Sequence, residues 1–466
     1  MTTPITDGLP IPQRYGAILT IALGITVAVL DGAIANVALP TIAADLHASP
    51  AASVWVVNAY QLAITISLLS LASLGEIFGY RRIYQIGLLV FSITSLACAL
   101  SDSLLTLTIA RVLQGFGAAA IMSVNVAMVR IIYPQRFLGR GMGINALIVA
   151  VSSAAGPTVA AAVLSVASWQ WLFAINLPIG MMAFILGLKF LPANTSKVPG
   201  QRFDIVSSLM NALTFGLLIS AISGYAQGQD HRLILLEVLV MVVVGWFFIR
   251  RQLSRPSPLL PVDLLRIPIF TLSLCTSMCS FAAQMLAFVS LPFFLQNTLG
   301  LDAVSTGLLL TPWPLATMVM APVSGRLVER YHAGMLGGIG LAIFAFGLYS
   351  LALLPVNPSH LNIIWRMLLC GAGFGLFQSP NNHTIVSSAP RSRSGGASGL
   401  LGTARLLGQT TGAAMVALMF NLFASHGTHA SLILAGTLAV GGAIISLLRM
   451  TQKTASQAAA DTTVKH

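Results

Sequence analysis

The sequence predicts an all-α integral membrane protein in which two related, parallel six-helix bundles flank a two-helix insert. Composition is the first reason, because 56% of the 466 residues are hydrophobic and 8% are charged, whereas soluble domains carry roughly 25% charge. The mean hydropathy is +0.87. Apolar stretches of about 20 residues, the length of a membrane-spanning helix, recur along the whole chain, and the two halves share motifs at a nearly constant offset.

About fourteen such stretches are bounded by charged residues or by Pro and Gly clusters. Each stretch is long enough to cross the hydrocarbon core of a bilayer as a helix. We therefore expect membrane spans at residues 15–39, 52–74, 83–101, 104–129, 141–164, 169–191, 204–224, 233–249, 269–295, 303–324, 334–355, 361–388, 396–424 and 428–448.

The distribution of basic residues sets the predicted orientation. With the N-terminus inside, 20 of the 24 Lys and Arg residues fall in cytoplasmic segments, and one, Arg232, falls in an outer loop. Cytoplasmic loops of membrane proteins carry an excess of Lys and Arg. We therefore expect a protein of the cytoplasmic (inner) membrane with both termini in the cytoplasm. We expect no cleaved signal peptide, because the first span is too long for one and contains Asp31.

An internal repeat relates the two halves of the chain. Val37-Ala-Leu-Pro40 recurs as Val289-Ser-Leu-Pro292 at an offset of 252, and Arg111 matches Arg366 at an offset of 255. Such a repeat of six spans in the same orientation predicts two bundles related by an axis along the membrane normal, with substrate held between them.

The repeat and the span positions together predict the domain boundaries. We expect an N-terminal six-helix bundle over residues 1–192, a two-helix insert over 193–252, a Pro-rich cytoplasmic linker over 253–268, a C-terminal six-helix bundle over 269–450 and a cytoplasmic tail over 451–466.

Several motifs resemble the fourteen-span drug:H+ antiporter branch of the major facilitator superfamily. Leu30-Asp-Gly-Ala-Ile-Ala-Asn-Val-Ala-Leu-Pro40 resembles its first-span signature, and Leu74-Gly-Glu-Ile-Phe-Gly-Tyr-Arg-Arg82 resembles the loop motif of the superfamily. Ala110-Arg-Val-Leu-Gln-Gly-Phe-Gly117 is similar to the fourth-span Arg motif, Gly156-Pro157 to the fifth-span antiporter motif, and Arg405-Leu-Leu-Gly-Gln-Thr-Thr-Gly412 also resembles this branch. The resemblance implies a proton-driven exporter that works by alternating access.

Asp31 is the leading candidate for chemistry. It is the one acidic residue of twelve that lies well inside a predicted span, and ionisable residues in the membrane are costly and usually functional. Arg111 lies at a similar predicted depth, roughly 10–12 Å below the outer surface, so the two side chains can meet. We predict that Asp31 binds the proton and a cationic substrate at a water-filled cavity, with Arg111 biasing its charge; the alternative is a static ion pair that locks two helices.

The C-terminal half offers a possible substrate cavity with different chemistry. Arg405 lies inside the thirteenth span with Gln409 one turn on, and no acidic residue lies inside a span of this half. We favour a structural or gating role for Arg405, and the alternative is that it receives an anionic substrate group. Asn381 and His383 follow Pro380 in span twelve, where a bent helix can expose polar groups to a cavity, although a hydrogen-bonded structural role for His383 is the alternative.

A further group of residues predicts conformational gating. Carboxylates close to cytoplasmic helix N-termini and arginines can form a latch, whereas the alternative is a solvated turn. A Gly-Pro pair in a span allows close packing and a bend. The gating candidates are Glu76, Gly79, Arg81, Arg82, Gly156, Pro157 and Glu329.

Other classes of function find no support in the sequence. The net charge of +12 is spread over single and paired basic residues, so no contiguous basic face for nucleic acid is predicted. His426-Gly-Thr-His429 supplies two potential metal ligands without a nearby third, and no Walker A motif is present for ATP. We expect no enzyme activity, no metal and no cofactor.

The predicted function is therefore secondary active transport, in which inward proton flow drives export of amphipathic, often cationic, organic compounds such as drugs, dyes or quaternary ammonium compounds. Two alternatives stay open: export of an endogenous anionic or zwitterionic metabolite, and a transporter-like sensor. The expected partners are a small-molecule substrate, protons and the lipid bilayer, and the expected state is a monomer.

Overall fold

The computed structural model describes residues 8–192, 203–226, 228–255, 258–355, 357–390, 393–423 and 426–451. Over these ranges the regular structure is helical throughout. Fourteen helical segments of the described chain are long and apolar enough to cross a membrane. The predicted all-α membrane fold with about fourteen spans is confirmed.

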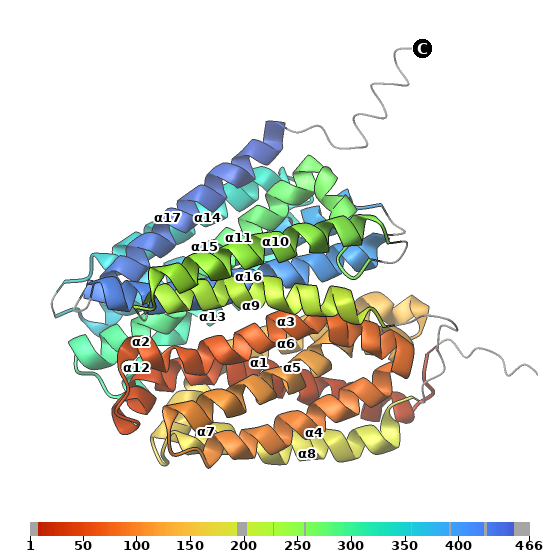
Figure 1. The fold of residues 1–466 in the computed structure, drawn as a ribbon, viewed down its shortest axis with the longest axis horizontal. Coiled ribbons are helices and arrows are strands. Elements are labelled where there is room, and N and C mark those ends of the chain that lie inside the picture. Colours follow the sequence, from red (N-terminus) through yellow and green to blue (C-terminus); the bar gives the residue numbers. More distant parts are fainter. Residues whose placement is uncertain are drawn as a thin grey trace, which may run out of the picture. The chain divides into compact units, whose positions relative to one another are not determined.

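The first half of the chain contributes nine α-helices and one 3-10 turn (Figure 1). In chain order they are α1 (Gln13–Asp45), α2 (Pro50–Ser53), α3 (Trp55–Phe78), α4 (Tyr80–Ala99), α5 (Leu104–Ile132), η1 (Gln135–Phe137), α6 (Leu138–Leu164), α7 (Gln170–Ala174), α8 (Asn176–Phe190) and α9 (Ile205–Ala226).

The second half begins with the long apolar helix α10 and ends at a short 3-10 turn (Figure 1). Its elements are α10 (His231–Leu253), η2 (Val262–Arg266), α11 (Pro268–Phe293), the π-helical turn η3 (Phe294–Thr298), α12 (Ala303–Leu310), α13 (Pro312–Leu327), α14 (Ala333–Ala352), α15 (His360–Ser388), α16 (Ser394–Phe423), α17 (Gly427–Leu448) and η6 (Arg449–Thr451).

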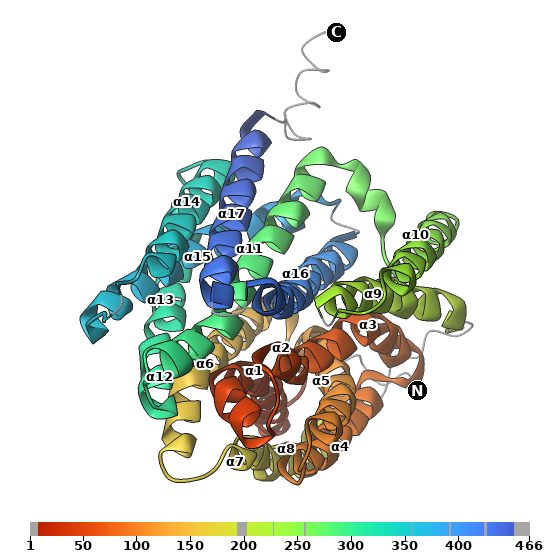
Figure 2. The same cartoon turned by 60° about the vertical axis from the view of Figure 1, so that its left-hand side comes forward.

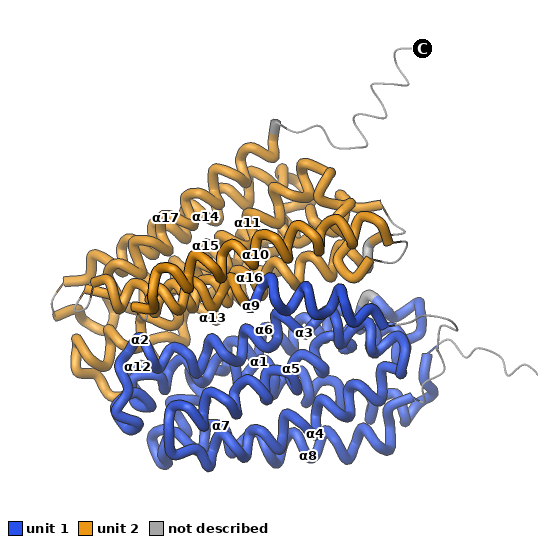
Figure 3. The backbone as a smooth tube through the Cα atoms, viewed as in Figure 1, with its two compact units in different colours: residues 1–216, 303–307 blue, residues 217–302, 308–466 orange. Residues whose placement is uncertain are grey.

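The chain divides into two compact units (Figure 3). Unit 1 comprises Met1–Gly216 with Ala303–Gly307, and unit 2 comprises Leu217–Asp302 with Leu308–His466. The predicted domain boundaries stay predictions. The start of the predicted insert at 193–202 and nearly all of the predicted cytoplasmic tail, residues 452–466, lie outside the described residues.

The internal repeat is also seen in the packing, because glycines at matching positions of the two halves let neighbouring helices approach closely. In unit 1, a Cβ atom added at Gly117 of α5 would lie 2.6 Å from the backbone nitrogen of Phe91 in α4. In unit 2, a Cβ atom added at Gly373 of α15 would lie 2.5 Å from the backbone nitrogen of Phe344 in α14, and Figure 2 shows these two helices side by side. Small residues let membrane helices approach closely, and here they do so at matching positions of both halves.

Aromatic side chains fill the core of unit 2. The ring of Trp313 in α13 contacts Phe344 in α14 with centroids 5.4 Å apart. Phe344 contacts Phe374 in α15 at 5.6 Å, and Phe374 contacts Phe281 in α11 at 5.3 Å, all edge to face. Such pairs add to the area that they bury. The chain of rings fixes Phe281 beside α16.

Candidate functional site

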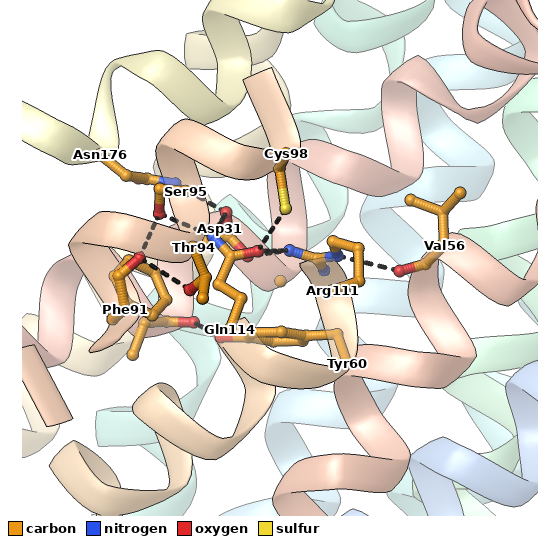
Figure 4. A network of polar contacts seen from close by, with 12 residues as sticks. Asp31, Val56, Tyr60, Phe91, Thr94, Ser95, Cys98, Arg111, Gln114 and Asn176 are labelled. Carbon is orange, nitrogen blue, oxygen red and sulfur yellow. Dashed lines mark hydrogen bonds and ion pairs between the residues drawn. The ribbon is translucent and has the colours of Figure 1, made fainter. Parts of the chain in front are cut away.

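Asp31 lies in the middle of α1 and is fully buried, and Figure 4 shows the polar contacts around it. Its Oδ1 atom accepts hydrogen bonds from Gln114 Nε2 at 3.1 Å and from Asn176 Nδ2 at 2.6 Å. Its Oδ2 atom forms an ion pair with Nη1 of Arg111. Helices α1, α5 and α8 thus meet at one carboxylate.

Arg111 is held from three directions in α5. Its Nε donates to the backbone oxygen of Val56 in α3 at 2.9 Å, and its Nη1 donates to Gln114 Oε1 at 2.6 Å as well as to Asp31. The guanidinium also lies 4.1 Å from the ring centroid of Tyr60. Both charged side chains of the pair have no exposed surface, so the pair is removed from solvent in this conformation.

Gln114 connects the ion pair to α4. Its Nε2 donates to Ser95 Oγ at 2.8 Å, and its Oε1 accepts from the thiol of Cys98 at 3.4 Å. Gln114 therefore contacts the carboxylate, the guanidinium and two side chains of α4 together. Such a buried network is specific because each member fixes its neighbours.

Arg111 has hydrogen-bond acceptors other than the Asp31 carboxylate. When the carboxylate takes up a proton, Arg111 retains the Val56 carbonyl and Gln114 Oε1 as hydrogen-bond acceptors. Nη2 of Arg111 and Oδ1 of Asn176 are also buried, with no partner among the described residues, and they supply hydrogen-bonding capacity for a rearranged network. Hydrogen-bonding capacity therefore remains unused next to the ion pair.

The structure places Asp31 and Arg111 in contact, as their similar predicted depth suggested, but it encloses them. The sequence interpretation had put this pair at a water-filled cavity, where the carboxylate would be open to substrate. In this conformation the carboxylate is neutralised and has no exposed surface. Its roles as proton site and cation site stay predictions.

Arg405 has a different environment in α16. Its side chain is partly exposed, and the guanidinium lies 5.3 Å from the ring centroid of Phe281. Gln409, one turn later, is partly exposed as well, and His383 in α15 is exposed. Asn381, the remaining predicted cavity residue, is fully buried.

Asn381 belongs to a second buried cluster, around Arg449 at the end of α17. Arg449 Nη1 donates to Asn381 Oδ1 at 2.6 Å and to Ser273 Oγ at 2.9 Å, and its Nη2 donates to the hydroxyl of Ser446. Asn381 in turn donates to Ser277 Oγ at 2.7 Å. This cluster joins α11, α15 and α17 with neutral partners around a buried cation.

The loop candidates for gating surround a sharp turn between α3 and α4. Gly79 forms this turn with a φ of +100°, a conformation that other residues adopt at a cost. Arg81 donates to the backbone oxygen of Leu188 at 2.5 Å, which ties the start of α4 to the end of α8. Glu76 and Arg82 are exposed.

The remaining gating candidates lie in α6 and after α13. A Cβ atom added at Gly156 would lie 2.4 Å from the Cβ of Ala33, so α6 crosses α1 two residues from Asp31. Pro157 is buried in the same helix, and Glu329 is exposed beyond the end of α13. The close crossing couples α6 to the helix that carries the carboxylate.

Comparison with known proteins decides the family. The family model described as Major Facilitator Superfamily matches residues 21–413, a range that includes Asp31, Arg111 and Arg405. The chain belongs to the major facilitator superfamily. It is thus a secondary transporter that moves a small molecule across a membrane, as the sequence predicted.

Relatives within the superfamily span most of the chain. An uncharacterized transporter of Escherichia coli (strain K12), YebQ, is 71% identical over 446 residues, which cover 96% of this chain and 98% of that protein. The riboflavin transporter RibZ of Clostridioides difficile is 29% identical over 408 residues, 88% of each chain. The tetracenomycin C resistance and export protein of Streptomyces glaucescens is 30% identical over 415 residues, 87% of this chain and 76% of that protein. The relatives near 30% identity agree with the predicted drug:H+ antiporter branch of the superfamily.

Solved structures of superfamily members share the fold. A transporter of the POT family in complex with a thioalcohol-conjugated peptide superimposes with a TM-score of 0.72 at 15% identity, covering 94% of this chain and 96% of that one. The inward-open xylose transporter XylE of Escherichia coli gives a TM-score of 0.62 at 14% identity, covering 93% and 95%. At these identities the likeness concerns the fold of the superfamily alone.

Three residues of the two buried clusters were missed by sequence reasoning. Gln114 lies three residues after Arg111, a spacing that puts both side chains on one helix face, and this signal was available. Asn176 opens α8 and carried no comparable signal. Arg449 was interpreted as one of the cytoplasmic charges that set the topology, and nothing in its neighbourhood in the sequence distinguishes it from an exposed arginine.

Proposed function

We propose that this protein is a proton-coupled antiporter that exports amphipathic organic compounds across the cytoplasmic membrane by alternating access. The observation that carries the proposal is the enclosed carboxylate of Asp31, paired with Arg111 and hydrogen-bonded by Gln114 and Asn176. A buried carboxylate next to a movable cation can exchange a proton when the conformation changes. The proton gradient is the energy source, and no cofactor is needed.

Asp31 would alternate between two states in this cycle. In the enclosed state Arg111 neutralises the carboxylate, and in an opened state a proton replaces the guanidinium. Binding of a cationic substrate at Asp31, the class predicted from the sequence, requires that Arg111 first release the carboxylate. Proton exchange is coupled to transport because Asp31 takes up and releases its proton only as the conformation changes.

The relatives support an exporter. Two of them are named as a riboflavin transporter and as a tetracenomycin C resistance and export protein. The name of the second protein states export, and we propose that direction here, in a monomer whose two termini face the cytoplasm. In this proposal the cytoplasmic turns with Glu76, Arg81 and Glu329 act as the latch of the outward-facing state.

The test is uptake of ethidium and of riboflavin into inverted membrane vesicles with and without an acid-inside pH gradient. The native protein is compared with Asp31→Asn and with a matched control, Asp102→Asn, whose carboxylate is exposed at the outer end of α4. Protein amount and melting temperature are measured for each variant.

We expect gradient-driven uptake of at least one compound in the native protein and in Asp102→Asn, and its loss in Asp31→Asn. Uptake that survives in Asp31→Asn would move the proton site elsewhere. Binding without gradient-driven movement in the native protein would indicate the sensor alternative and overturn the proposal.

A further inference from the structure

Arg405 lies at membrane depth without an acidic partner. It is nine residues inside the span Gly396–Phe423, which corresponds to roughly 13 Å at 1.5 Å per residue. Among the residues that the structure describes, no side chain forms an ion pair or hydrogen bond with its guanidinium. A charged side chain at this depth is costly and normally faces a partner or a water-filled path.

Two other arginines, Arg111 and Arg366, have side-chain partners that Arg405 lacks among the described residues. Arg111 pairs with Asp31 in unit 1. Arg366, near the start of α15, donates from Nε to Asn362 Oδ1 at 2.9 Å. The side chain of Arg405 is partly exposed instead, and its nitrogens are not among the buried polar atoms without a partner. Arg405 is therefore a positive group that is open to a ligand.

The surroundings of Arg405 suit an aromatic, amphipathic molecule. The ring centroid of Phe281 lies 5.3 Å from the guanidinium carbon, and Phe281 in turn packs edge to face against Phe374. Gln284, one turn after Phe281 in α11, and Gln409, one turn after Arg405 in α16, are partly exposed amides. A planar cation, an aromatic face and neutral amides are the groups that bind an anionic ring system.

The charges of the two units favour an anion over a cation. In unit 1 the Asp31 carboxylate is already neutralised by Arg111 and enclosed, so a cation has to displace a bound guanidinium. In unit 2 an anion meets an accessible guanidinium that has no competing carboxylate. Arg binds carboxylates through two parallel hydrogen bonds, and a desolvated site strengthens such a contact.

We propose that Arg405 binds the carboxylate or phenolate group of an aromatic, amphipathic substrate, so that the exported compound is anionic or zwitterionic. The inference rests on the proposed function, since it names the substrate class of the same exporter. In this inference Arg405 of unit 2 binds the negatively charged group of the substrate, and Asp31 of unit 1 exchanges the proton.

The test uses two fluorescent dyes that differ in one group. Rhodamine B carries a carboxylate and is zwitterionic, whereas its ethyl ester has the same ring system and is a cation. Binding of both dyes to the purified full-length protein in detergent is measured by fluorescence anisotropy, for the native chain, Arg405→Gln, Arg405→Lys and the matched control Arg366→Gln.

We expect the native protein and Arg366→Gln to bind rhodamine B at least tenfold more tightly than the ester. Arg405→Gln should abolish this preference, and Arg405→Lys should keep part of it because the charge remains. Equal binding of the two dyes, no binding of either, or a preference that survives in Arg405→Gln would overturn the inference. If Arg405→Gln does not fold, the native protein and Arg405→Lys still decide.

Gradient-driven uptake of the same dyes separates this inference from the proposed function. Uptake that requires Asp31 but shows no preference for the carboxylate would refute the inference and leave proton-coupled export standing. A carboxylate preference that depends on Arg405 but comes without gradient-driven uptake would support the inference and refute the export proposal.

Discussion

The two units contain related helices, but their arginines at matching positions have different partners. In unit 1 an arginine of α5 is fully buried and pairs with a carboxylate of α1. At the matching position of unit 2, Arg366 of α15 is partly exposed and contacts Asn362 and the ring of Trp365, and the residues that match Asp31 are Ala283 and Gln284. The repeat therefore preserved packing, whereas the buried Asp31–Arg111 ion pair occurs in unit 1 and not at the matching position of unit 2.

The difference separates two tasks of a transporter. A neutralised, enclosed pair can change its charge state when the conformation changes, because water and protons reach it only then. A cation without an acid keeps its charge and stays available to a ligand. The buried Arg449 of unit 2 represents a third case, since neutral acceptors surround it completely.

Breaking the ion pair should have the largest effect on stability. Arg111→Ala leaves the enclosed Asp31 carboxylate without its cation, and we expect the free energy of unfolding to fall by about 3–5 kcal/mol. Arg366→Ala should lower it by less than about 1 kcal/mol, because that arginine is partly exposed. Unfolding in SDS of both purified variants measures the contrast; equal losses would show that the two arginines are equivalent.

Glycine substitutions test the packing that the repeat preserved. A Cβ atom added at Gly371 would lie 2.1 Å from the backbone oxygen of Trp313, and one added at Gly115 would lie 2.6 Å from that of Tyr60. We expect Gly371→Ala and Gly115→Ala each to cost about 1–3 kcal/mol, with the larger loss at Gly371. The melting temperatures of the two variants measure the loss of stability. If neither variant melted below the native protein, the predicted close packing at these glycines would be contradicted.

The neutral cluster around Arg449 should be less sensitive than the ion pair. Arg449→Gln removes the charge together with the hydrogen bonds to Ser273 and Ser446, and we expect a loss of about 1–2 kcal/mol. No carboxylate is left unpaired, so the loss should be smaller than for Arg111→Ala. The same SDS unfolding series measures it, and a loss larger than that of Arg111→Ala would reverse the ranking of the two clusters.

The smallest effect should come from Gln114. Gln114→Leu removes the hydrogen bonds to Asp31 and Ser95 and the acceptor for Arg111 and Cys98. Asn176 still donates to the carboxylate, and the Val56 carbonyl still accepts from Arg111. We expect a loss of about 1 kcal/mol, because hydrogen bonds between membrane helices are worth little on average. If Gln114→Leu unfolded the protein, the network rather than the ion pair would dominate unit 1.

Hydropathy and repeats were sufficient to predict the fold. Apolar stretches of spanning length predicted fourteen spans, since a bilayer imposes helix length directly, and the family followed from local motifs. The contact between Asp31 and Arg111 was predictable from depth alone. What depth cannot supply is the rotation of each helix, which packing decides.

Helix rotation accounts for contacts that sequence reasoning did not predict. It turns Asn381 toward Arg449 and not toward Arg405, and it brings Asn176 to Asp31. Enclosure of a charged pair is also a property of the packed helices, so the exposure of Asp31 could not be inferred from its position in the chain.

The most direct test of the central claim is infrared difference spectroscopy of the protein in lipid as the pH is lowered. The account predicts that a carboxylic acid C=O band of protonated Asp31 appears in the native protein and in Asp102→Asn, and that this band is absent in Asp31→Asn. An identical band in all three proteins would show that Asp31 does not carry the proton.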